Sequence, residues 1–360
     1  MSQRPDFIVI GGGIAGVAAG ARLSKLGRVT LLEGESALGY HASGRSAAMF
    51  EESYGLPPVK ALNRASRDFH MTENGGVLSP RGLMLLGGAG DEARFAHDMV
   101  EMAMEPISPA EAQAIVPILD TTAVTMAGIH TEAWDLDTDL LIQNFARDIR
   151  ATGQVITGAS VDSITRTPSG WQVVANGQSH EAPQLVNAAG AWVDEVANLA
   201  GITPLGFQPF RRSMARLPAP GGHDVTRWPM IFGAGETWYA KPDAGALLVS
   251  PAEQDPVPPQ DAWADDMVLA EGLARYEAMV TEPVTRMISN WAGLRTFSPD
   301  RNLVIGRSPE DESFLWMAGQ GGYGFQTAPA ASRLLADLVG GTASELDADI
   351  VAALSPARFA

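Results

Sequence analysis

Hydrophobic residues near the N-terminus fall into two short runs separated by a glycine turn and a helical segment. Residues 7–10 read Phe-Ile-Val-Ile, a continuous apolar run typical of a strand that is buried on both faces. The next residues, 11–16, read Gly-Gly-Gly-Ile-Ala-Gly, and the Ala-rich segment 17–26 that follows favours a helix. A second apolar run, 29–32, ends on Glu33. This order predicts a strand–turn–helix–strand unit with an acid at its end.

The glycine turn has the spacing of a dinucleotide-binding site. Gly11 permits the tight turn, Gly13 lets the backbone approach a pyrophosphate, and Gly16 lets the helix pack closely against the sheet. The helix N-terminus offers unpaired N–H groups to the anion. Glu33 follows roughly twenty residues later, where a carboxylate accepts hydrogen bonds from a ribose and repels a 2′-phosphate. The unit therefore predicts FAD or NAD rather than NADP, with an ordinary glycine-rich turn as the alternative.

The rest of the chain mixes further strands with a region, 80–150, that lacks the strand–helix alternation. In that region the pattern favours helices at 91–104 and 108–116. Near the C-terminus, a glycine-rich turn at 319–327 opens a closing helix. One further helix is expected at 266–280. Further strands are expected at 154–164, 171–175, 184–188, 213–217, 230–232, 237–241, 246–249, 303–306 and 314–318.

Composition excludes several classes of protein. The 360 residues include 25 Lys and Arg against 42 Asp and Glu, a net charge of −17 that repels nucleic acid and anionic membranes. There is no cysteine, which excludes disulfides, thiolate metal sites, thiol catalysis and a cysteine-linked flavin. Residues 7–26 are apolar, but their glycines and Arg22 argue against a signal peptide or a membrane span. We expect a soluble, cytoplasmic protein.

A cluster of acids imitates the start of a calcium-binding loop. Leu140 stands where such a loop requires glycine, and Ala146 stands where it requires a bidentate acid. We therefore predict no metal site, and expect Asp137 or Thr138 to cap a helix instead. The acids are Asp135, Asp137 and Asp139.

Taken together, six segments resemble the D-amino-acid oxidase and glycine oxidase superfamily of FAD-dependent oxidoreductases. Within it, the likeness is greatest to bacterial D-arginine dehydrogenases. The matching segments follow the family's order over nearly the whole chain. They are 11–16, 41–48, 187–192, 239–243 (Tyr-Ala-Lys-Pro-Asp), 291–297 and 320–327.

The resemblance implies an α/β fold with two domains. The first is a glutathione-reductase-like, Rossmann-type domain in which FAD lies extended, and the second is an α+β substrate domain built on a mixed β-sheet. The expected FAD-binding domain comprises 1–82, 151–204 and 284–360, and the expected substrate-binding domain comprises 83–150 and 205–283.

The resemblance also implies the reaction. A D-amino acid would lose a hydride from Cα to flavin N5, and water would hydrolyse the imino acid to a 2-oxo acid and ammonia. A dehydrogenase is favoured over an oxidase, with the electron acceptor, a quinone or oxygen, left open. Oxidation of N-methylated or cyclic amino acids or of 2-hydroxy acids is the alternative reaction. A module that binds FAD without catalysis is the alternative class.

Five residues match the family's substrate-binding positions. Arg212 and Arg295 would bind the substrate carboxylate, because a guanidinium fork matches a carboxylate. Tyr239 would donate a hydroxyl to the same carboxylate, and Tyr54 would belong to an active-site lid. The carbonyl of Gly322 would hold the substrate amine. For either arginine, and for Arg211, a surface ion pair is the alternative.

The resemblance assigns a larger set of residues to the cofactor. They come from the glycine turn, the loop after the second strand, and the two later glycine turns. They are Gly11, Gly13, Ile14, Ala15, Gly16, Glu33, Ser43, Arg45, Ser46, Ala47, Ala48, Val161, Ala188, Gly190, Trp192, Gly293, Gly321, Gly322, Tyr323, Gly324, Gln326 and Thr327.

Two departures from the D-arginine enzymes bear on specificity. Met49 replaces their histidine, and Leu83 replaces the glutamate that meets the guanidinium. Both changes exchange a polar for an apolar residue, which predicts a preference for apolar or aromatic D-amino acids over D-arginine. Glu51 or Glu236 is the alternative acid that would reach a basic side chain, and Met49 and Leu83 are alternatively plain core residues.

Overall fold

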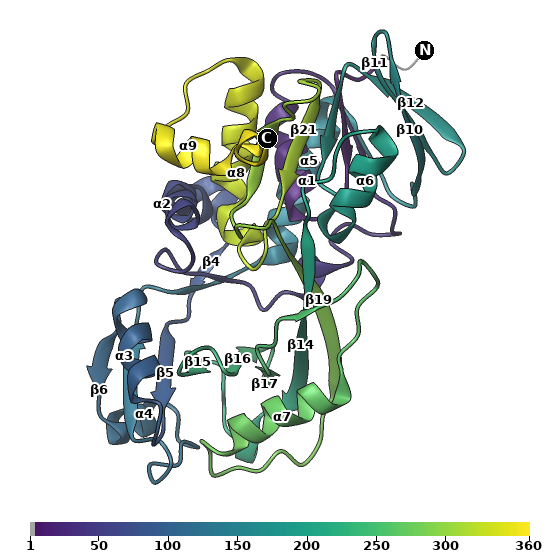
Figure 1. The fold of residues 1–360 in the computed structure, drawn as a ribbon. Helices are drawn as coiled ribbons and strands as arrows, with labels where there is room; N and C mark the ends of the chain where they lie inside the picture. The colour runs from purple at the N-terminus through teal and green to yellow at the C-terminus, as the bar shows by residue number, and fades with distance from the viewer. Residues whose placement is uncertain (1–3) are drawn as a thin grey trace.

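The computed structural model describes residues 4–360 and has an upper and a lower part in the view of Figure 1. The upper part is built on a six-stranded sheet and the lower part on a nine-stranded sheet. Two long strands, β14 (Gln208–Pro218) and β19 (Ser289–Phe297), run between the two parts. Within residues 4–360 no helix is long and apolar enough to cross a bilayer.

The six-stranded sheet has the order β20-β21-β13-β1-β2-β9 and is parallel except for β20. Strand β1 lies inside it and pairs with both β2 and β13, so its short apolar run is buried on both faces as predicted. The strands are β1 Phe7–Ile10, β2 Val29–Leu32, β9 Gln154–Ile156, β13 Gln184–Asn187, β20 Val304–Arg307 and β21 Phe314–Ala318.

The two faces of this sheet are covered differently. Phe7 and Val9 point to a face packed by helices α1 (Ile14–Leu23), α5 (Thr138–Thr152) and α8 (Gly324–Gly340). The alternate residues of β1 point to a face packed by α6 and by a separate three-stranded sheet. Its elements are α6 Val193–Ala200, β10 Val161–Thr167, β11 Gly170–Ala175 and β12 Gln178–Ala182. The outer helices are α2 Pro57–Thr72 and α9 Ala348–Leu354.

The lower part is a mixed sheet in the order β18-β14-β17-β16-β15-β5-β7-β6, with β19 on the other edge of β14. Only β15 and β5 pair in parallel. Its remaining strands are β5 Leu83–Gly87, β6 Glu105–Ile107, β7 Met126–His130, β15 Met230–Gly233, β16 Tyr239–Asp243, β17 Ala246–Ser250 and β18 Asp255–Pro256. The helices of this part are α3 Glu92–Glu101, α4 Pro109–Ile115 and α7 Asp266–Glu277.

Short elements connect the two parts. A three-stranded sheet has the order β3-β8-β4. Its strands are β3 Met49–Phe50, β4 Leu78–Pro80 and β8 Trp134–Leu136. The single-turn helices are η1 Ala42–Arg45, η2 Glu73–Gly75, η3 Gly190–Trp192, η4 Pro220–Gly222 and η5 Pro356–Phe359.

Three expectations about organisation need correction. The predicted strand 154–164 is two strands of different sheets, because the backbone turns at Gly158 with φ 66°. Helix α5 packs on α1, with Ile149 against Gly20, and therefore belongs to the upper part, although the expected substrate-binding domain includes 83–150. Strand β19 pairs along β14 and belongs to the lower sheet, although 284–360 was assigned to the FAD domain.

Helix capping follows the prediction. The Asp137 side chain accepts a hydrogen bond of 2.9 Å from the N–H of Leu140 and so caps α5. In α4, Ser108 and Glu111 form a reciprocal capping box. Of the three acids in this segment, Asp137 is therefore the helix cap.

Gly16 offers a test of the packing in the upper part. A Cβ at this position would lie 1.9 Å from the carbonyl oxygen of Gly11. We expect Gly16→Ala to lower the free energy of unfolding by roughly 1–3 kcal/mol, the usual cost of overpacking. Gly340→Ala is the control, because its Cβ would meet only Leu26 at 3.6 Å. Urea denaturation of both variants checks this, and equal stability would contradict it.

Candidate active site

The glycine turn between β1 and α1 is closed by backbone contacts. Gly11 has φ 106°, and its N–H donates to the carbonyl of Leu32 at 2.9 Å. A Cβ on Gly11 would lie 2.4 Å from the carbonyl oxygen of Ala188, so only glycine fits. At the N-terminus of α1, the N–H of Ile14 donates to Ser43 Oγ at 3.0 Å. The turn therefore keeps the start of α1 close to the loop that holds Ser43.

A first cavity of 530 Å³ opens beside this turn. Glu33 lies on its wall, where the carboxylate accepts the N–H of Gly12 at 2.5 Å and the N–H of Glu35 at 2.8 Å. The carboxylate is thus held in place with acceptor capacity to spare, which fits a ribose. The predicted cofactor residues on the wall are Gly11, Gly13, Glu33, Ser43, Arg45, Val161, Ala188, Gly190 and Trp192.

A second cavity of 140 Å³ adjoins the first and reaches the N-terminus of α8. The two share Gly13, Ser43 and Gly190 on their walls, so they form one elongated path. The N-terminus of α1 opens onto this path and suits a pyrophosphate. The predicted cofactor residues that it adds are Ile14, Ala15, Ser46, Ala47, Gly293, Gly321, Gly322 and Gly324. The path fits an extended dinucleotide.

A third cavity of 110 Å³ lies against the end of this path. It shares Arg212, Tyr239, Arg295 and Gly322 with the second cavity. All residues that the sequence analysis placed at the substrate lie on its wall. They are Tyr54, Arg212, Tyr239, Arg295, Gly322, Met49, Glu51, Leu83 and Glu236.

The two arginines are brought together by the β14–β19 pair. Arg212 on β14 lies opposite Gly293 on β19, two residues from Arg295. Arg212 is 7% exposed, donates from Nε to the carbonyl of Glu253 at 2.9 Å, and has a buried Nη2 with no hydrogen-bond partner in residues 4–360. Within the same residues the side chain of Arg295 makes no hydrogen bond or ion pair, although its backbone belongs to the β14–β19 ladder. Two guanidinium groups therefore face the cavities with free donors.

Charges and hydroxyls around the arginines adjust the site. Burial, and next the positive charge of Arg295, lowers the pKa of Arg212. Burial and the nearby Glu236 raise the pKa of Tyr54 well above its ordinary value, so the phenol stays neutral and donates to Glu236 Oε2 at 3.3 Å. The ring of Tyr239 lies 5.9 Å from the Arg212 guanidinium carbon. The site thus presents two guanidinium cations beside aromatic side chains, and guanidinium groups suit a carboxylate.

A buried ion cluster below the site was missed by sequence reasoning. Lys241 Nζ lies 2.9 Å from Asp135 Oδ1, 3.2 Å from the carbonyl of Ala48, and also bonds the carbonyl of Ala47. Arg81 Nε bonds Asp135 at 2.7 Å. The cluster holds Ala48 at φ 33°, an unusual value outside glycine. The two-residue period of β16 was the available signal, because it puts Lys241 on the same face as Tyr239.

Several predicted residues have other contacts. Gly16, Tyr323 and Thr327 do not line the three cavities. The ring of Tyr323 instead contacts that of Tyr54, with centroids 5.3 Å apart and the ring planes tilted by 60°. Arg45 lines the cofactor path, but its guanidinium binds Asp261 and the carbonyls of 262 and 292.

The predicted acids and the substrate pocket also have partners that the sequence did not indicate. Glu51 is buried, and Oε2 lies 3.0 Å from His130 Nε2. Arg211 pairs with Asp255 at 2.7 Å, as the ion-pair alternative had it. The pocket residues that sequence reasoning missed are Met102, Met230, Phe232 and Trp238. The alternation of side chains along β15 indicates that Met230 and Phe232 share a face, but not that this face lines a cavity.

Comparison with known proteins identifies the family. A family model described as FAD dependent oxidoreductase matches residues 6–338. The chain belongs to this family. FAD is therefore its cofactor, and the first two cavities hold the residues that fit it.

Individual relatives are distant but match over most of their length. FAD-dependent oxidoreductase domain-containing protein 1 of Bos taurus is 24% identical over 400 residues, covering 94% of this chain and 81% of the relative. Glycine oxidase of Bacillus licheniformis is 25% identical over 361 residues, covering 94% of each. The crystal structure of L-proline dehydrogenase from P. horikoshii superposes with a TM-score of 0.83 at 23% identity, covering 100% of this chain and 98% of that chain.

Glu33 provides a test of the cofactor site. We expect Glu33→Gln to weaken FAD binding by about tenfold, because a hydrogen bond to a charged acceptor contributes roughly 1.5–3 kcal/mol. Glu181→Gln on β12 is the control, since Glu181 lies outside the three cavities. Titration of apoprotein with FAD, followed by flavin fluorescence, measures both. An unchanged dissociation constant in Glu33→Gln would remove Glu33 from the site.

Proposed function

We propose that this protein is an FAD-dependent dehydrogenase of D-amino acids that prefers apolar or aromatic side chains. The observation that carries the proposal is the pair of buried guanidinium groups, Arg212 and Arg295, that form no ion pair among residues 4–360. They lie where the cofactor path meets the third cavity. The names of glycine oxidase and L-proline dehydrogenase among the similar proteins support an amino-acid substrate.

The carboxylate of the substrate would lie between the two arginines. The free Nη2 of Arg212 and the unpaired guanidinium of Arg295 would both donate hydrogen bonds to its oxygens. Removing either guanidinium would leave the other to hold the anion alone. The Tyr239 hydroxyl lies on the same wall and adds a further hydrogen-bond donor. The polar end of the pocket is thus specific for an acid.

The amine of the substrate would face Gly322, which begins the approach to α8. A Cβ at this position would lie 3.0 Å from Arg295 Nη1, so glycine lets the backbone come close to the substrate. Holding carboxylate and amine together fixes Cα against the cofactor path. FAD, when bound, supplies the hydride acceptor. The imino acid formed would be hydrolysed by water to a 2-oxo acid and ammonia.

The side-chain end of the pocket supports the preference for apolar substrates. Met49, Leu83, Met102, Met230 and Phe232 line it. Methionine side chains adapt to differently shaped apolar groups. The positions at which D-arginine dehydrogenases, the subgroup that the sequence resembles, carry polar residues are apolar here.

The acids of the pocket are already engaged. Glu51 accepts the N–H of Ser53 at 2.6 Å and lies beside His130. Glu236 accepts the hydroxyl of Tyr54. These contacts account for both acids without a basic substrate side chain, and the apolar wall of the pocket then favours an apolar one.

Oxidation of N-methylated or cyclic amino acids is the second candidate. The same arginine pair would bind their carboxylates, and the likeness to L-proline dehydrogenase favours this class over 2-hydroxy acids. Assignment as a dehydrogenase rather than an oxidase, with a quinone or oxygen as the electron acceptor, belongs to the proposal, as does a cytoplasmic location.

Anaerobic mixing of the holoprotein with amino acids tests the function. We expect apolar D-amino acids to bleach the flavin band, which lies at about 450 nm in flavins generally, faster than D-arginine does, and L-isomers not to bleach it. Bleaching by proline or N-methylated amino acids alone would select the second candidate. An absorbance that none of these compounds changes would overturn the proposed function.

Arg295 is the residue for a direct test of carboxylate binding. We expect Arg295→Met to raise KM for the best D-amino acid by about a hundredfold, because a charge-assisted bidentate contact is lost. Arg216→Met is the matched control, since Arg216 lies on β14 but pairs with Asp243 at 3.2 Å on the outside. Steady-state kinetics with an artificial electron acceptor measure both. Equal KM values in the two variants would exclude Arg295 from the binding site.

A further inference from the structure

On the edge of β14 that faces β17 and β18, no strand pairs with the residues next to Arg212. Its pairing with β17 runs from Pro218 only as far as Ala215, and its pairing with β18 begins at Arg211. Between these two ladders the chain leaves the sheet at 251–254, where Ala252 has φ 56°. Residues 212–214 therefore face a bulge rather than a strand on this edge.

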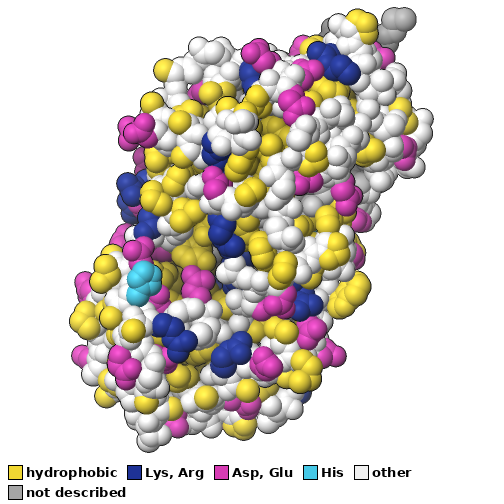
Figure 2. Space-filling view, in the orientation of Figure 1, with side chains coloured by type: hydrophobic (Ala, Val, Ile, Leu, Met, Phe, Trp, Pro, Cys, Tyr) yellow, Lys and Arg dark blue, Asp and Glu magenta, His cyan; other side chains and the backbone are white. Residues whose placement is uncertain are grey.

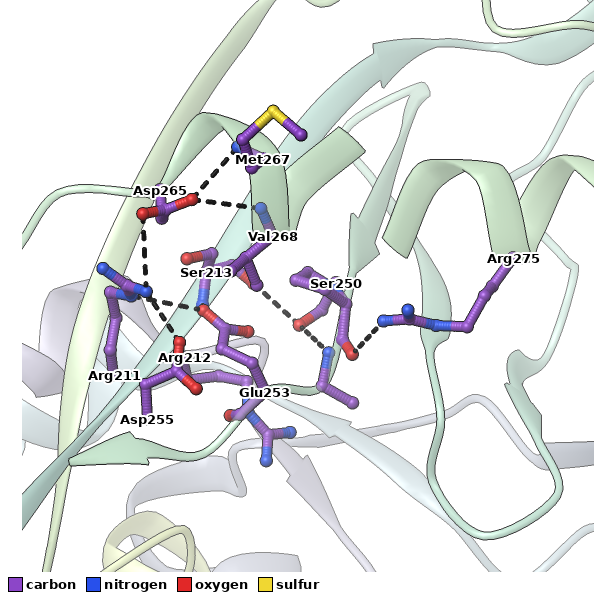
Figure 3. Close-up of polar contacts among 12 residues, drawn as sticks. Arg211, Arg212, Ser213, Ser250, Glu253, Asp255, Asp265, Met267, Val268 and Arg275 are labelled. Carbon is purple, nitrogen blue, oxygen red and sulfur yellow. Dashed lines mark hydrogen bonds and ion pairs between the residues drawn. The ribbon is translucent and has the colours of Figure 1, made fainter. Parts of the chain in front are cut away.

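Side chains of the bulge replace the missing ladder bonds. Glu253 Oε1 accepts the N–H of Ser213 at 2.6 Å, and Ser250 Oγ donates to the carbonyl of Ser213 at 2.7 Å. Ser250 Oγ in turn accepts the N–H of Ala252 at 3.1 Å. Figure 3 shows these contacts around Ser213. Both backbone groups of Ser213 are thus satisfied by side chains instead of a neighbouring strand.

The bulge also aims a carbonyl at the substrate-site arginine. The Glu253 carbonyl oxygen accepts from Arg212 Nε at 2.9 Å, and this is the one hydrogen bond of the Arg212 side chain within residues 4–360. Arg211 points away from Arg212 and pairs with Asp255 (Figure 3). A regular ladder would direct its carbonyls at backbone N–H groups, so the bulge is what makes this one available.

The bulge is held from behind by α7. Arg275 donates to the carbonyl of Pro251 at 3.1 Å and to the carbonyl of Thr237 at 2.9 Å. At Gly272 a Cβ would lie 2.3 Å from Pro251 Cβ, so the helix packs directly on the bulge. The bulge that carries Glu253 is therefore held by the helix at Pro251 and by β14 at Ser213.

We propose that Glu253 is a positioning residue that orients Arg212 for carboxylate recognition. Its carboxylate fixes the bulge to Ser213, and its carbonyl holds Nε so that Nη2 stays free toward the pocket. The inference rests on the proposed function, in which Arg212 receives the substrate carboxylate. Orientation before binding removes the cost of immobilising a long side chain when the ligand arrives.

A double-mutant cycle on the holoprotein tests the inference. The probe is benzoate, an aromatic carboxylate without an amine, and its binding is followed by the change in flavin absorbance. We expect Glu253→Ala to weaken benzoate binding by about ten- to a hundredfold, since a charge-assisted contact is misaligned. Arg212→Met also weakens binding. In the Arg212→Met background, Glu253→Ala should cause no further loss.

Further variants separate positioning from general destabilisation. Glu253→Gln keeps an acceptor for the N–H of Ser213 and should bind benzoate nearly as well as the unaltered protein. Asp255→Asn is the control, because it weakens an ion pair of the same strand without touching Arg212. If Glu253→Ala yields no folded yellow protein, Ser250→Ala takes its place in the cycle and is read by the same criterion.

The outcomes are distinct from failure of the proposed function. Losses that multiply in the double variant, or an equal loss in Asp255→Asn, would overturn the positioning role while carboxylate binding by the unaltered protein stands. An unaltered protein that binds no benzoate and is reduced by no amino acid would overturn the proposed function, and the positioning role with it.

Discussion

The structure depends on keeping two buried guanidinium groups, those of Arg212 and Arg295, side by side without an ion-pair partner among residues 4–360. Two such cations repel each other, and burial costs each of them solvation. The lowered pKa of Arg212, caused by burial and by Arg295, reflects this cost. The arrangement is tolerable because the neighbouring phenols and Glu236 offset part of it. A ligand carboxylate would offset the remaining repulsion and lost solvation, so the site favours ligands that carry an acid group.

The two arginines are held next to each other by the antiparallel strands β14 and β19. The ladder between β14 and β19 continues from Gln208 opposite Phe297 to Arg216 opposite Ser289, and it sets the spacing of the two arginines rigidly. Both strands reach from the lower sheet to the upper part (Figure 1). Hydrophobic side chains gather between the parts, with basic and acidic groups beside them, on the face shown in Figure 2. The polar pocket is thus carried by regular backbone rather than by loops.

The cofactor path and the substrate pocket are coupled through short segments. Lys241 fixes the carbonyls of Ala47 and Ala48, and these residues line the substrate cavity.

The protein carries a net charge of −17, but a zwitterionic amino acid has no net charge and is not repelled by it. Selection therefore takes place inside the pocket, where solvent screening is weak.

Much of this was accessible from the sequence, for local reasons. The turn at Gly11 requires a positive φ, the acid at 33 follows at a fixed distance, and a buried parallel strand reads as a continuous apolar run. Each is decided within some thirty residues, the length of a βαβ unit. Family resemblance extended this to Arg212, Arg295 and the wall of the third cavity.

Only the tertiary structure decided the contacts between distant segments. Helix α5 has an amphipathic pattern that fits either part, and its packing on α1 was settled by the shape of the assembled core. The pairing of β14 with β19 joins residues some eighty apart, and no local pattern encodes that register. The bulge that presents Glu253 to Arg212, and the approach of Lys241 to Ala47, arise from backbone geometry and burial, which the sequence expresses only once the whole chain has folded.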